Sequence, residues 1–157
     1  MRGFFEIEKP VVPRKPNRKA YNCESCGLYK QVRSPKMPYT GEGELNTFIL
    51  SEAPGRTEDL QNKQLVGDAG NILREALKEN DYDLDRDFYK QNSCSCRPTD
   101  KDGNNRTPTK NEIIACEPNW RKELESLKPK FIILMGSKAV EAFYMYRSQP
   151  ITSDLSI

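Results

Sequence analysis

The segment Thr47-Phe48-Ile49-Leu50-Ser51-Glu52-Ala53-Pro54-Gly55 sets the architecture expected of this 157-residue chain. Its first four residues form an apolar run that predicts a short buried strand, and the Pro-Gly pair predicts a tight turn after it. Downstream, Phe131-Ile132-Ile133-Leu134-Met135 is apolar at every position. Such a strand is expected to be buried on both faces, as in a parallel sheet covered by helices. Residues 88–93 predict one more strand.

Helices are predicted between and after these strands. The first follows Gly67 and Gly70 and has four apolar side chains on one face, namely Ile72, Leu73, Ala76 and Leu77. Thr109-Lys110-Asn111-Glu112 is a capping box that begins the next helix, which Pro118 is expected to bend or split. The last helix is expected at residues 138–146. This alternation of strands and helices predicts one α/β domain with right-handed crossovers.

Polar residues follow the predicted strands. Glu52, Asn92 and Ser137 each lie at or just beyond the end of a predicted strand. The carboxyl ends of parallel strands lie at one edge of a sheet, and ligands bind in the crevice outside that edge. We therefore expect these three side chains to converge on one cleft.

Charge is distributed unevenly along the chain. Residues 1–40 contain nine Lys or Arg against three Glu, a net charge of +6, whereas the remainder contains sixteen against twenty acidic residues, a net charge of −4. Residues 1–20 also contain three prolines, so we expect a flexible basic arm there. The arm suits a polyanionic partner, and a solvated tail is an equally good interpretation. The chain has no histidine, which excludes a histidine base or ligand.

Neither a membrane span nor a secretory signal is predicted. No segment approaches the roughly 20 apolar residues of a membrane helix, and Met1 is not followed by the apolar core of a signal peptide. We therefore expect a cytoplasmic protein with reduced thiols. Clustered cysteines in such a protein are metal-binding or catalytic rather than disulfide-bonded.

Four of the five cysteines form a candidate metal-binding set. Cys23 and Cys26 are a Cys-x2-Cys pair, and Cys96 and Cys116 follow with nineteen residues between them. A zinc ribbon usually has a second close pair, whereas iron–sulfur clusters accept dispersed sets of four cysteines. The spacing favours a metal site and leaves open both metals, and also four buried cysteines without a metal. Cys94 is expected to be a small buried strand residue.

A series of short motifs runs through the chain in a fixed order. Ser51-Glu52-Ala53-Pro54-Gly55 is followed by Glu58-Asp59 and by Val66-Gly67-Asp68-Ala69-Gly70. Cys96-Arg97-Pro98 and Asn105-Arg106-Thr107-Pro108-Thr109 come later. In order and spacing, and with the four cysteines, these motifs resemble the signature of family 4 uracil-DNA glycosylases. That signature runs Gly-Glu-Ala-Pro-Gly, Glu-Asp and Pro-Phe-Val-Gly-x-Ala-Gly.

The resemblance implies a fold, a cofactor and a reaction. The fold is a three-layer α/β/α sandwich around a short, four-stranded parallel sheet. The cofactor is a four-iron, four-sulfur cluster that pins the N-terminal segment, with the ligands Cys23, Cys26, Cys96 and Cys116. The reaction is hydrolysis of the N-glycosidic bond of uracil in DNA after base flipping. Glu52 would stabilise the positively charged sugar and orient water, and Asn92 would pair with the edge of uracil.

The resemblance also implies residues that bind the base and the DNA. The expected base-binding residues are Ser51, Ala53, Pro54, Gly55, Leu65 and Asn92. The expected DNA-binding residues are Arg97, Arg106 and Ser137.

The chain departs from the family pattern at several positions. Leu65 stands where the pattern has a Phe that stacks on uracil, and Gln64 replaces the preceding Pro. Because base–aromatic stacking contributes about 1–3 kcal/mol, we expect weaker base capture. Ser51 replaces the leading Gly, and the Gly expected near Asn62 is absent. The family also continues beyond residue 150 with a fourth strand and a His-Pro motif, whose His donates to the leaving uracil. Loss of one such donor typically lowers the rate about 10²–10³-fold.

These departures leave two functions open. We expect a flexible arm at residues 1–20 and a glycosylase-like domain at residues 21–157 that is incomplete at its C-terminal end. The domain is either part of a longer polypeptide, such as a phage replication protein, or a shortened relative. It acts either as a monomeric uracil-DNA glycosylase or as a weakly active or inactive DNA-binding module that accompanies replication or repair proteins.

Overall fold

The computed structural model describes residues 24–147. Cys23, the arm predicted at residues 1–20 and the C-terminal residues 148–157 lie outside the described residues. The described part begins with an irregular segment that contains the short 3-10 helix η1 (Leu28–Lys30). The remaining elements follow in the order β1 (Thr47–Ser51), α1 (Arg56–Gln61), α2 (Asp68–Lys78), β2 (Phe88–Asn92), α3 (Lys110–Leu127), β3 (Phe131–Leu134) and α4 (Ser137–Arg147).

The strands form one parallel sheet in the order β2-β1-β3, so β1 is central. In this register Ser51 pairs with Asn92, and Leu50 pairs with Leu134. The three strands end at the same edge of the sheet, as predicted. The described residues contribute three strands, one fewer than the resemblance implies.

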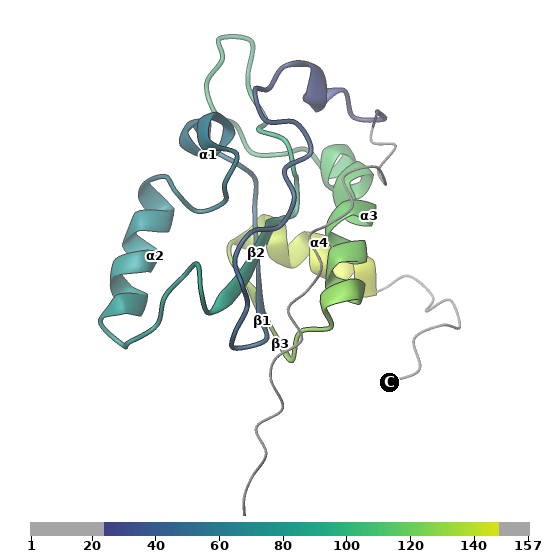
Figure 1. Cartoon of the computed structure of the whole chain (residues 1–157). Helices are drawn as coiled ribbons and strands as arrows, with labels where there is room; N and C mark the ends of the chain where they lie inside the picture. Colours follow the sequence, from purple (N-terminus) through teal and green to yellow (C-terminus); the bar gives the residue numbers. More distant parts are fainter. Residues whose placement is uncertain (1–23, 148–157) are drawn as a thin grey trace, which may run out of the picture.

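The helices cover both faces of the sheet, so the domain has three layers (Figure 1). Phe48 and Leu50 pack with residues of α3 and α4 in one buried cluster. Ile49, on the opposite face, packs with Leu73 and Leu77 of α2. The sheet therefore lies between α2 on one side and α3 and α4 on the other. The predicted α/β/α sandwich is confirmed.

The prediction that residues 131–135 are buried on both faces is wrong. Phe131 and Ile133 are 65% and 42% exposed, whereas Ile132 and Leu134 pack against the cluster formed with α3 and α4. The reason is that β3 is an outer strand of the described sheet. On the face of Phe131 and Ile133, α2 covers the neighbouring strand and leaves β3 accessible. A continuous apolar run predicts a strand but not its place in the sheet.

The predicted apolar face of α2 is partly correct. Leu73 and Leu77 pack against the sheet, but Ile72 is 70% exposed and Ala76 is exposed as well. The contact with the sheet is therefore narrower than the apolar pattern. None of the helices within residues 24–147 is long and apolar enough to cross a membrane.

Helix α3 begins at the predicted capping box. The Thr109 hydroxyl accepts from the Glu112 N–H at 3.3 Å, and the Glu112 carboxylate accepts from the Thr109 N–H at 2.7 Å. Pro118 lies inside the helix, which is continuous from Lys110 to Leu127. The alternative that Pro118 splits the helix is therefore wrong, because the missing N–H removes a single bond from a long helix. A bend at Pro118 stays a prediction.

The irregular segment before β1 is attached to α1 through Asp59. The Asp59 carboxylate accepts from the Ser34 N–H at 2.8 Å, and the Ser34 hydroxyl donates to the Asp59 carbonyl at 2.6 Å. Both residues are buried. These bonds hold the segment without any metal, so pinning by a metal stays a prediction.

A buried lysine lies in the middle of β2. The Lys90 side chain is fully buried and donates to Asp85. The same carboxylate contacts Lys63 at 3.0 Å and Arg74 at 2.9 Å. Although burial alone would raise the pKa of Asp85, the hydrogen bonds from Lys90 and Lys63 hold it well below its ordinary value. One carboxylate thus joins β2, α2 and the connection between α1 and α2.

Gln91 is the centre of a buried chain of hydrogen bonds on the other face of β2. Its Oε1 accepts from the Asn92 N–H at 2.7 Å and from Gln64 Nε2 at 3.3 Å. Its Nε2 donates to the Met37 carbonyl at 3.1 Å and to Glu123 Oε2 at 2.6 Å. We call Gln64, Gln91 and Glu123 the Gln91 network. It joins α3, the α1–α2 connection and the segment before β1 to β2.

Glu123 is expected to make the stability of the protein depend on pH. Burial raises the pKa of its carboxyl from 4.5 to about 7, and the hydrogen bonds from Gln91 and the Tyr39 N–H oppose this only in part. The folded protein therefore holds the proton more tightly than the unfolded chain. This stabilisation is complete below pH 4.5 and is lost as the pH rises through about 7. The slope approaches about 1.4 kcal/mol per pH unit within that window.

Denaturant unfolding over this pH range measures the effect. The Glu123→Gln variant should lose this contribution to the slope, whatever its absolute stability. Glu125→Gln is the matched control, because Glu125 lies on the same helix with a 40% exposed side chain, and it should keep the wild-type slope. Equal slopes in wild type and Glu123→Gln would contradict the prediction.

Candidate active site

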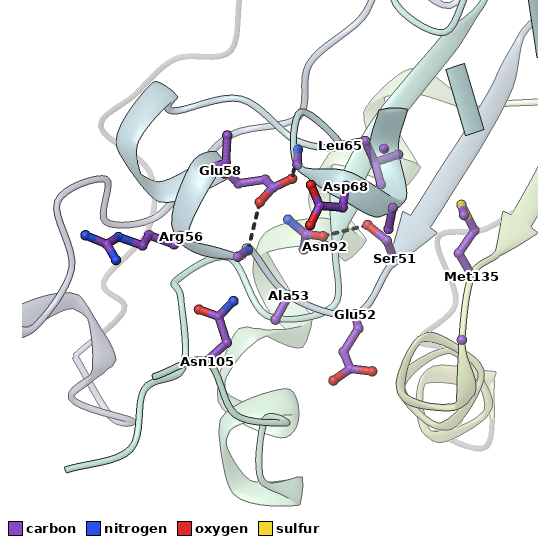
Figure 2. Close-up of a pocket in the computed structure, with 16 residues that line it drawn as sticks. Ser51, Glu52, Ala53, Arg56, Glu58, Leu65, Asp68, Asn92, Asn105 and Met135 are labelled. Atoms are coloured by element: carbon purple, nitrogen blue, oxygen red, sulfur yellow. Dashed lines mark hydrogen bonds between the residues drawn. The ribbon is translucent and has the colours of Figure 1, made fainter. Parts of the chain in front are cut away.

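A pocket of about 560 Å³ opens at the carboxyl ends of the strands (Figure 2). Its walls are the loop after β1, the connection between α1 and α2 with the start of α2, and the ends of β2 and β3. The lining residues are Ser51, Glu52, Ala53, Gly55, Arg56, Thr57, Glu58, Leu65, Gly67, Asp68, Ala69, Gly70, Asn92, Asn105, Met135 and Gly136. The predicted cleft is therefore present where the strands end.

Ser51 and Asn92 lie side by side on the floor of this pocket, at the ends of β1 and β2. The Ser51 hydroxyl donates to Asn92 Oδ1 at 2.6 Å, as Figure 2 shows. Asn92 is 3% exposed, and its Nδ2 has no hydrogen-bond partner among the described residues. An unpaired buried donor in a pocket is a group that a ligand acceptor can satisfy.

Glu52 follows Ser51 directly, at the turn that ends β1. Its carbonyl accepts from the Ser93 hydroxyl at 2.7 Å and from the Cys94 N–H at 3.1 Å, which fixes the backbone of the turn. The half-buried side chain lines the pocket. Within residues 24–147 no side chain or backbone N–H donates to its carboxylate. The carboxylate thus keeps its full capacity to accept from a ligand or water.

Glu58 holds the two ends of the loop that borders the pocket. Its carboxylate accepts from the N–H groups of Gly55, Val66 and Gly67 at 3.1, 3.0 and 2.7 Å. It is 9% exposed. A carboxylate that accepts three backbone donors satisfies groups that would otherwise be buried without partners. Glu58 therefore shapes the pocket wall, and Figure 2 shows its carboxylate bonded to backbone nitrogens on either side.

Leu65 is held against the start of α2 in a left-handed conformation, with φ of 55°. A β-carbon at Gly70 would lie 2.1 Å from the Leu65 carbonyl oxygen. Only glycine permits this approach. The Gly of the family-like motif thus places Leu65 in the pocket wall, where its side chain is half-buried.

The predicted base-binding and DNA-binding residues divide into two groups. Ser51, Ala53, Gly55 and Leu65 line the pocket with Glu52 and Asn92. Pro54 is buried and does not line the pocket, and Ser137 begins α4 beside the pocket residue Gly136. Glu52 and Asn92 thus converge on the pocket as expected, but Ser137 does not join them among the lining residues. The base-binding role of Pro54 and the DNA-binding role of Ser137 stay predictions.

Arg97 and Arg106 both make contacts within the protein. Arg97 donates to Asn105 Oδ1 at 2.6 Å and to the Gly103 carbonyl at 3.0 Å. Arg106 forms a two-bond pair with the Glu112 carboxylate, at 2.6 and 2.9 Å. Binding of DNA by these residues stays a prediction.

Several pocket residues were not predicted as site residues. Arg56, the first residue of α1, and Asp68, the first residue of α2, adjoin motif residues and were detectable by that position. Asn105 reaches the pocket from the loop after β2, where Arg97 binds its side chain. Met135 reaches it from the end of β3. Asn105 belongs to a motif that carries the resemblance, but only the fold shows that it and Met135 reach the pocket.

Three of the four predicted metal ligands lie in one apolar cluster. Cys96 and Cys116 belong to this cluster together with Cys94 and Leu28, and the partly buried Cys26 packs against it. Cys96 and Cys116 are each 1% exposed. Cys94 is fully buried, as predicted, but it lies in the bend after β2 and not in a strand. Its thiol donates to the Cys96 carbonyl at 3.4 Å.

Backbone N–H groups point at two of these sulfur atoms. The Lys36 N–H donates to Cys96 Sγ and the Ser95 N–H donates to Cys116 Sγ, each at 3.2 Å. Donors of this kind stabilise thiolates, the form in which cysteine binds metals. No group of three or more ligating side chains within residues 24–147 is arranged to hold a metal ion, and Cys23 lies outside that range. The metal site therefore stays a prediction.

Comparison with known proteins identifies relatives by sequence. The model of the uracil DNA glycosylase superfamily matches residues 37–153. A type-4 uracil-DNA glycosylase of Pyrobaculum aerophilum is 38% identical over 122 residues, which are 77% of this chain and 59% of the relative. A type-4 uracil-DNA glycosylase of Saccharolobus solfataricus is 35% identical over 114 residues, 73% of this chain and 50% of the relative.

A third relative, the type-4 uracil-DNA glycosylase of Thermotoga maritima, is 34% identical over 132 residues, 83% of this chain and 65% of the relative. The chain thus spans about half to two thirds of the length of the curated relatives it matches. The family match includes all of the pocket residues. The chain belongs to the uracil DNA glycosylase superfamily.

Proposed function

We propose that the chain hydrolyses the N-glycosidic bond of uracil in DNA. The observation that carries the proposal is the unpaired Nδ2 of Asn92, buried in a pocket that Glu52 also lines. The two groups match the two halves of the reaction, recognition of a pyrimidine and stabilisation of a cationic sugar. The names of the relatives support the same substrate.

Asn92 recognises the base in this proposal. Uracil has a carbonyl oxygen at the position where cytosine has an amino group. A side-chain N–H donor pairs with that oxygen and is left facing another donor when the base is cytosine. The pocket reads one base at a time, so the target nucleotide must first leave the DNA stack.

Glu52 acts on the sugar. Cleavage of the bond between base and deoxyribose develops positive charge on the sugar and negative charge on the base. A carboxylate beside the sugar stabilises the positive charge and orients water for attack. The Glu52 carboxylate is suited to both tasks because no described group donates to it, while its backbone is fixed by Ser93 and Cys94.

Leu65 supplies an apolar contact in place of an aromatic ring. Its half-buried side chain lines the pocket, and the loop that holds it is fixed by Glu58 and Gly70. An aliphatic side chain contacts a base without the stacking energy of an aromatic one. We therefore assign the chain weaker base capture than the family pattern implies.

DNA phosphates would approach from the side of the pocket that carries exposed cations. Arg56 lines the pocket and is exposed, and Figure 2 shows its side chain directed away from the pocket interior. Such a side chain is placed to bind a phosphate next to a flipped nucleotide. The basic arm at residues 1–20 would add sequence-independent attraction.

Cytoplasmic localisation and a monomeric state remain part of the proposal.

A four-iron, four-sulfur cluster is the cofactor that fits the cysteines. Cys26, Cys96 and Cys116 share one apolar cluster, and backbone donors aim at two of the sulfur atoms. Cys23 would be the fourth ligand. When bound, the cluster supplies a covalent cross-link between the N-terminal segment, the loop after β2 and α3. The catalytic groups Glu52 and Asn92 do not depend on it for their chemistry.

A DNA-binding module without catalysis is the second candidate. Leu65 favours it, because the loss of the stacking ring weakens capture of a flipped base. In that case the domain would accompany a replication or repair protein. The two candidates differ in whether free uracil is produced.

Release of free uracil from a uracil-containing oligonucleotide tests the main proposal. The wild-type protein should release uracil, and Glu52→Gln should do so about 10²–10³-fold more slowly, because the transition state loses its carboxylate. Glu42→Gln is the control, since Glu42 is an exposed glutamate that does not line the pocket. No release by anaerobically purified wild type, with DNA binding retained, would favour the DNA-binding module.

Substitution of single cysteines tests the cluster. Anaerobically purified wild type should be brown with absorbance at roughly 400 nm. Cys116→Ser should lose most of the iron and the colour. Cys94→Ser is a matched control, because Cys94 is equally buried in the same apolar cluster but is not a predicted ligand, and it should keep both. A full iron content in Cys116→Ser would contradict the ligand assignment, and zinc in place of iron would contradict the cluster type.

A further inference from the structure

Ser51 and Asn92 form a buried, hydrogen-bonded pair on the floor of the pocket. Ser51 is the last residue of β1 and Asn92 the last residue of β2, and the sheet register sets them opposite each other. Their side chains are 7% and 3% exposed, and Ser51 Oγ lies 2.6 Å from Asn92 Oδ1. The family pattern has glycine at the position of Ser51, so a chain that follows the pattern has no hydroxyl there.

In the structure, Ser51 Oγ lies against the oxygen of the Asn92 amide and not against its nitrogen. The distance of 2.6 Å is ordinary for a hydroxyl that donates to an oxygen. The other acceptor near the hydroxyl, the Gln91 carbonyl, is 3.3 Å away. A hydroxyl has one hydrogen, and the shorter contact takes it. The oxygen end of the Asn92 amide therefore faces Ser51.

The nitrogen end of the amide then faces away from Ser51. In Figure 2 the Asn92 nitrogen lies on the side opposite the dashed bond to Ser51. It is buried and has no partner among the described residues. The backbone of Asn92 cannot turn to relieve this, because its N–H donates to Gln91 Oε1 at 2.7 Å. The orientation of the amide is the remaining variable.

We propose that Ser51 is a positioning residue that sets base specificity by holding the Asn92 amide with its Nδ2 toward the bound base. In this orientation the site offers a donor to a base carbonyl and rejects a base amino group. The inference rests on the proposed function for the identity of the base. In this proposal Asn92 contacts the base, and the hydrogen bond from Ser51 fixes which end of the Asn92 amide makes the contact.

Loss of the hydroxyl frees the amide to turn. With alanine or glycine at position 51, Asn92 Oδ1 loses its donor and the two amide orientations become close in energy. The turned amide presents an acceptor to the base, which suits the amino group of cytosine. Affinity for uracil should fall, affinity for cytosine should rise, and discrimination should shrink.

Binding to two oligonucleotides separates recognition from chemistry. In a Glu52→Gln background, fluorescence anisotropy gives the Kd for single-stranded DNA with one uracil and for the same strand with cytosine at that position. The ratio of the Kd for the cytosine strand to the Kd for the uracil strand measures discrimination. Adding Ser51→Ala or Ser51→Gly should lower this ratio about tenfold, as expected for one buried hydrogen bond. Adding Ser51→Thr, which keeps the hydroxyl, should preserve the ratio.

Ser34→Ala is the matched control in the same background. Ser34 is another buried serine whose hydroxyl donates over 2.6 Å, in this case to the Asp59 carbonyl outside the pocket. It should lower stability and leave the ratio unchanged. An unchanged ratio in Ser51→Ala, or an equal loss in Ser34→Ala, would overturn the role of Ser51.

The outcomes also separate this inference from the proposed function. A protein with intact Glu52 that releases no uracil, while the binding ratio depends on Ser51, refutes hydrolysis and supports the role of Ser51. A protein that releases uracil, while Ser51→Ala keeps the full ratio, supports hydrolysis and overturns the role of Ser51.

Discussion

The four hydrogen bonds of the Gln91 side chain are the interaction on which the rest of the site depends. They join β2 to α3 through Glu123, to the α1–α2 connection through Gln64, and to the segment before β1 through Met37. They also fix the backbone of Asn92. A buried network of this kind stabilises a fold only when every member is satisfied. Since Gln64 also adjoins Leu65, the network supports two residues that line the pocket, Leu65 and Asn92.

The sequence was sufficient to predict the three layers of the fold, but not which strands lie at the edges of the sheet. The apolar runs at Phe48 and Ile132, and the capping box at Thr109, led to the correct order of the three strands and of α2, α3 and α4, but α1 was not predicted. Exposure of Phe131 and Ile133 was missed, because an apolar run does not state which strand lies outermost. The pattern of residues within a segment predicts its local structure. Which segments lie beside it depends on packing between distant parts of the chain.

Residues of the site were predicted where the resemblance assigns them a role. They were missed where only the fold shows that they reach the pocket. Glu52 and Leu65 were predicted from the motif after β1 and line the pocket. Asn105 and Met135 enter the pocket from loops far along the chain. The bond between Ser51 and Asn92 could not be predicted either, since it depends on the register of two strands. Sequence spacing carries no information on such pairs.

Lys90 has a consequence for how this sequence can evolve. A charged residue occupies a strand position where a parallel sheet ordinarily has an aliphatic one. Removing Asp85 first would leave the buried ammonium of Lys90 unpaired. Removing Lys90 first would leave the carboxylate paired with two partly exposed cations, Lys63 and Arg74. Neither step is neutral, so descendants are expected to keep both residues or to exchange both together. Among diverging homologues the pair should therefore change as a unit, at a position where a lone aliphatic residue would drift freely.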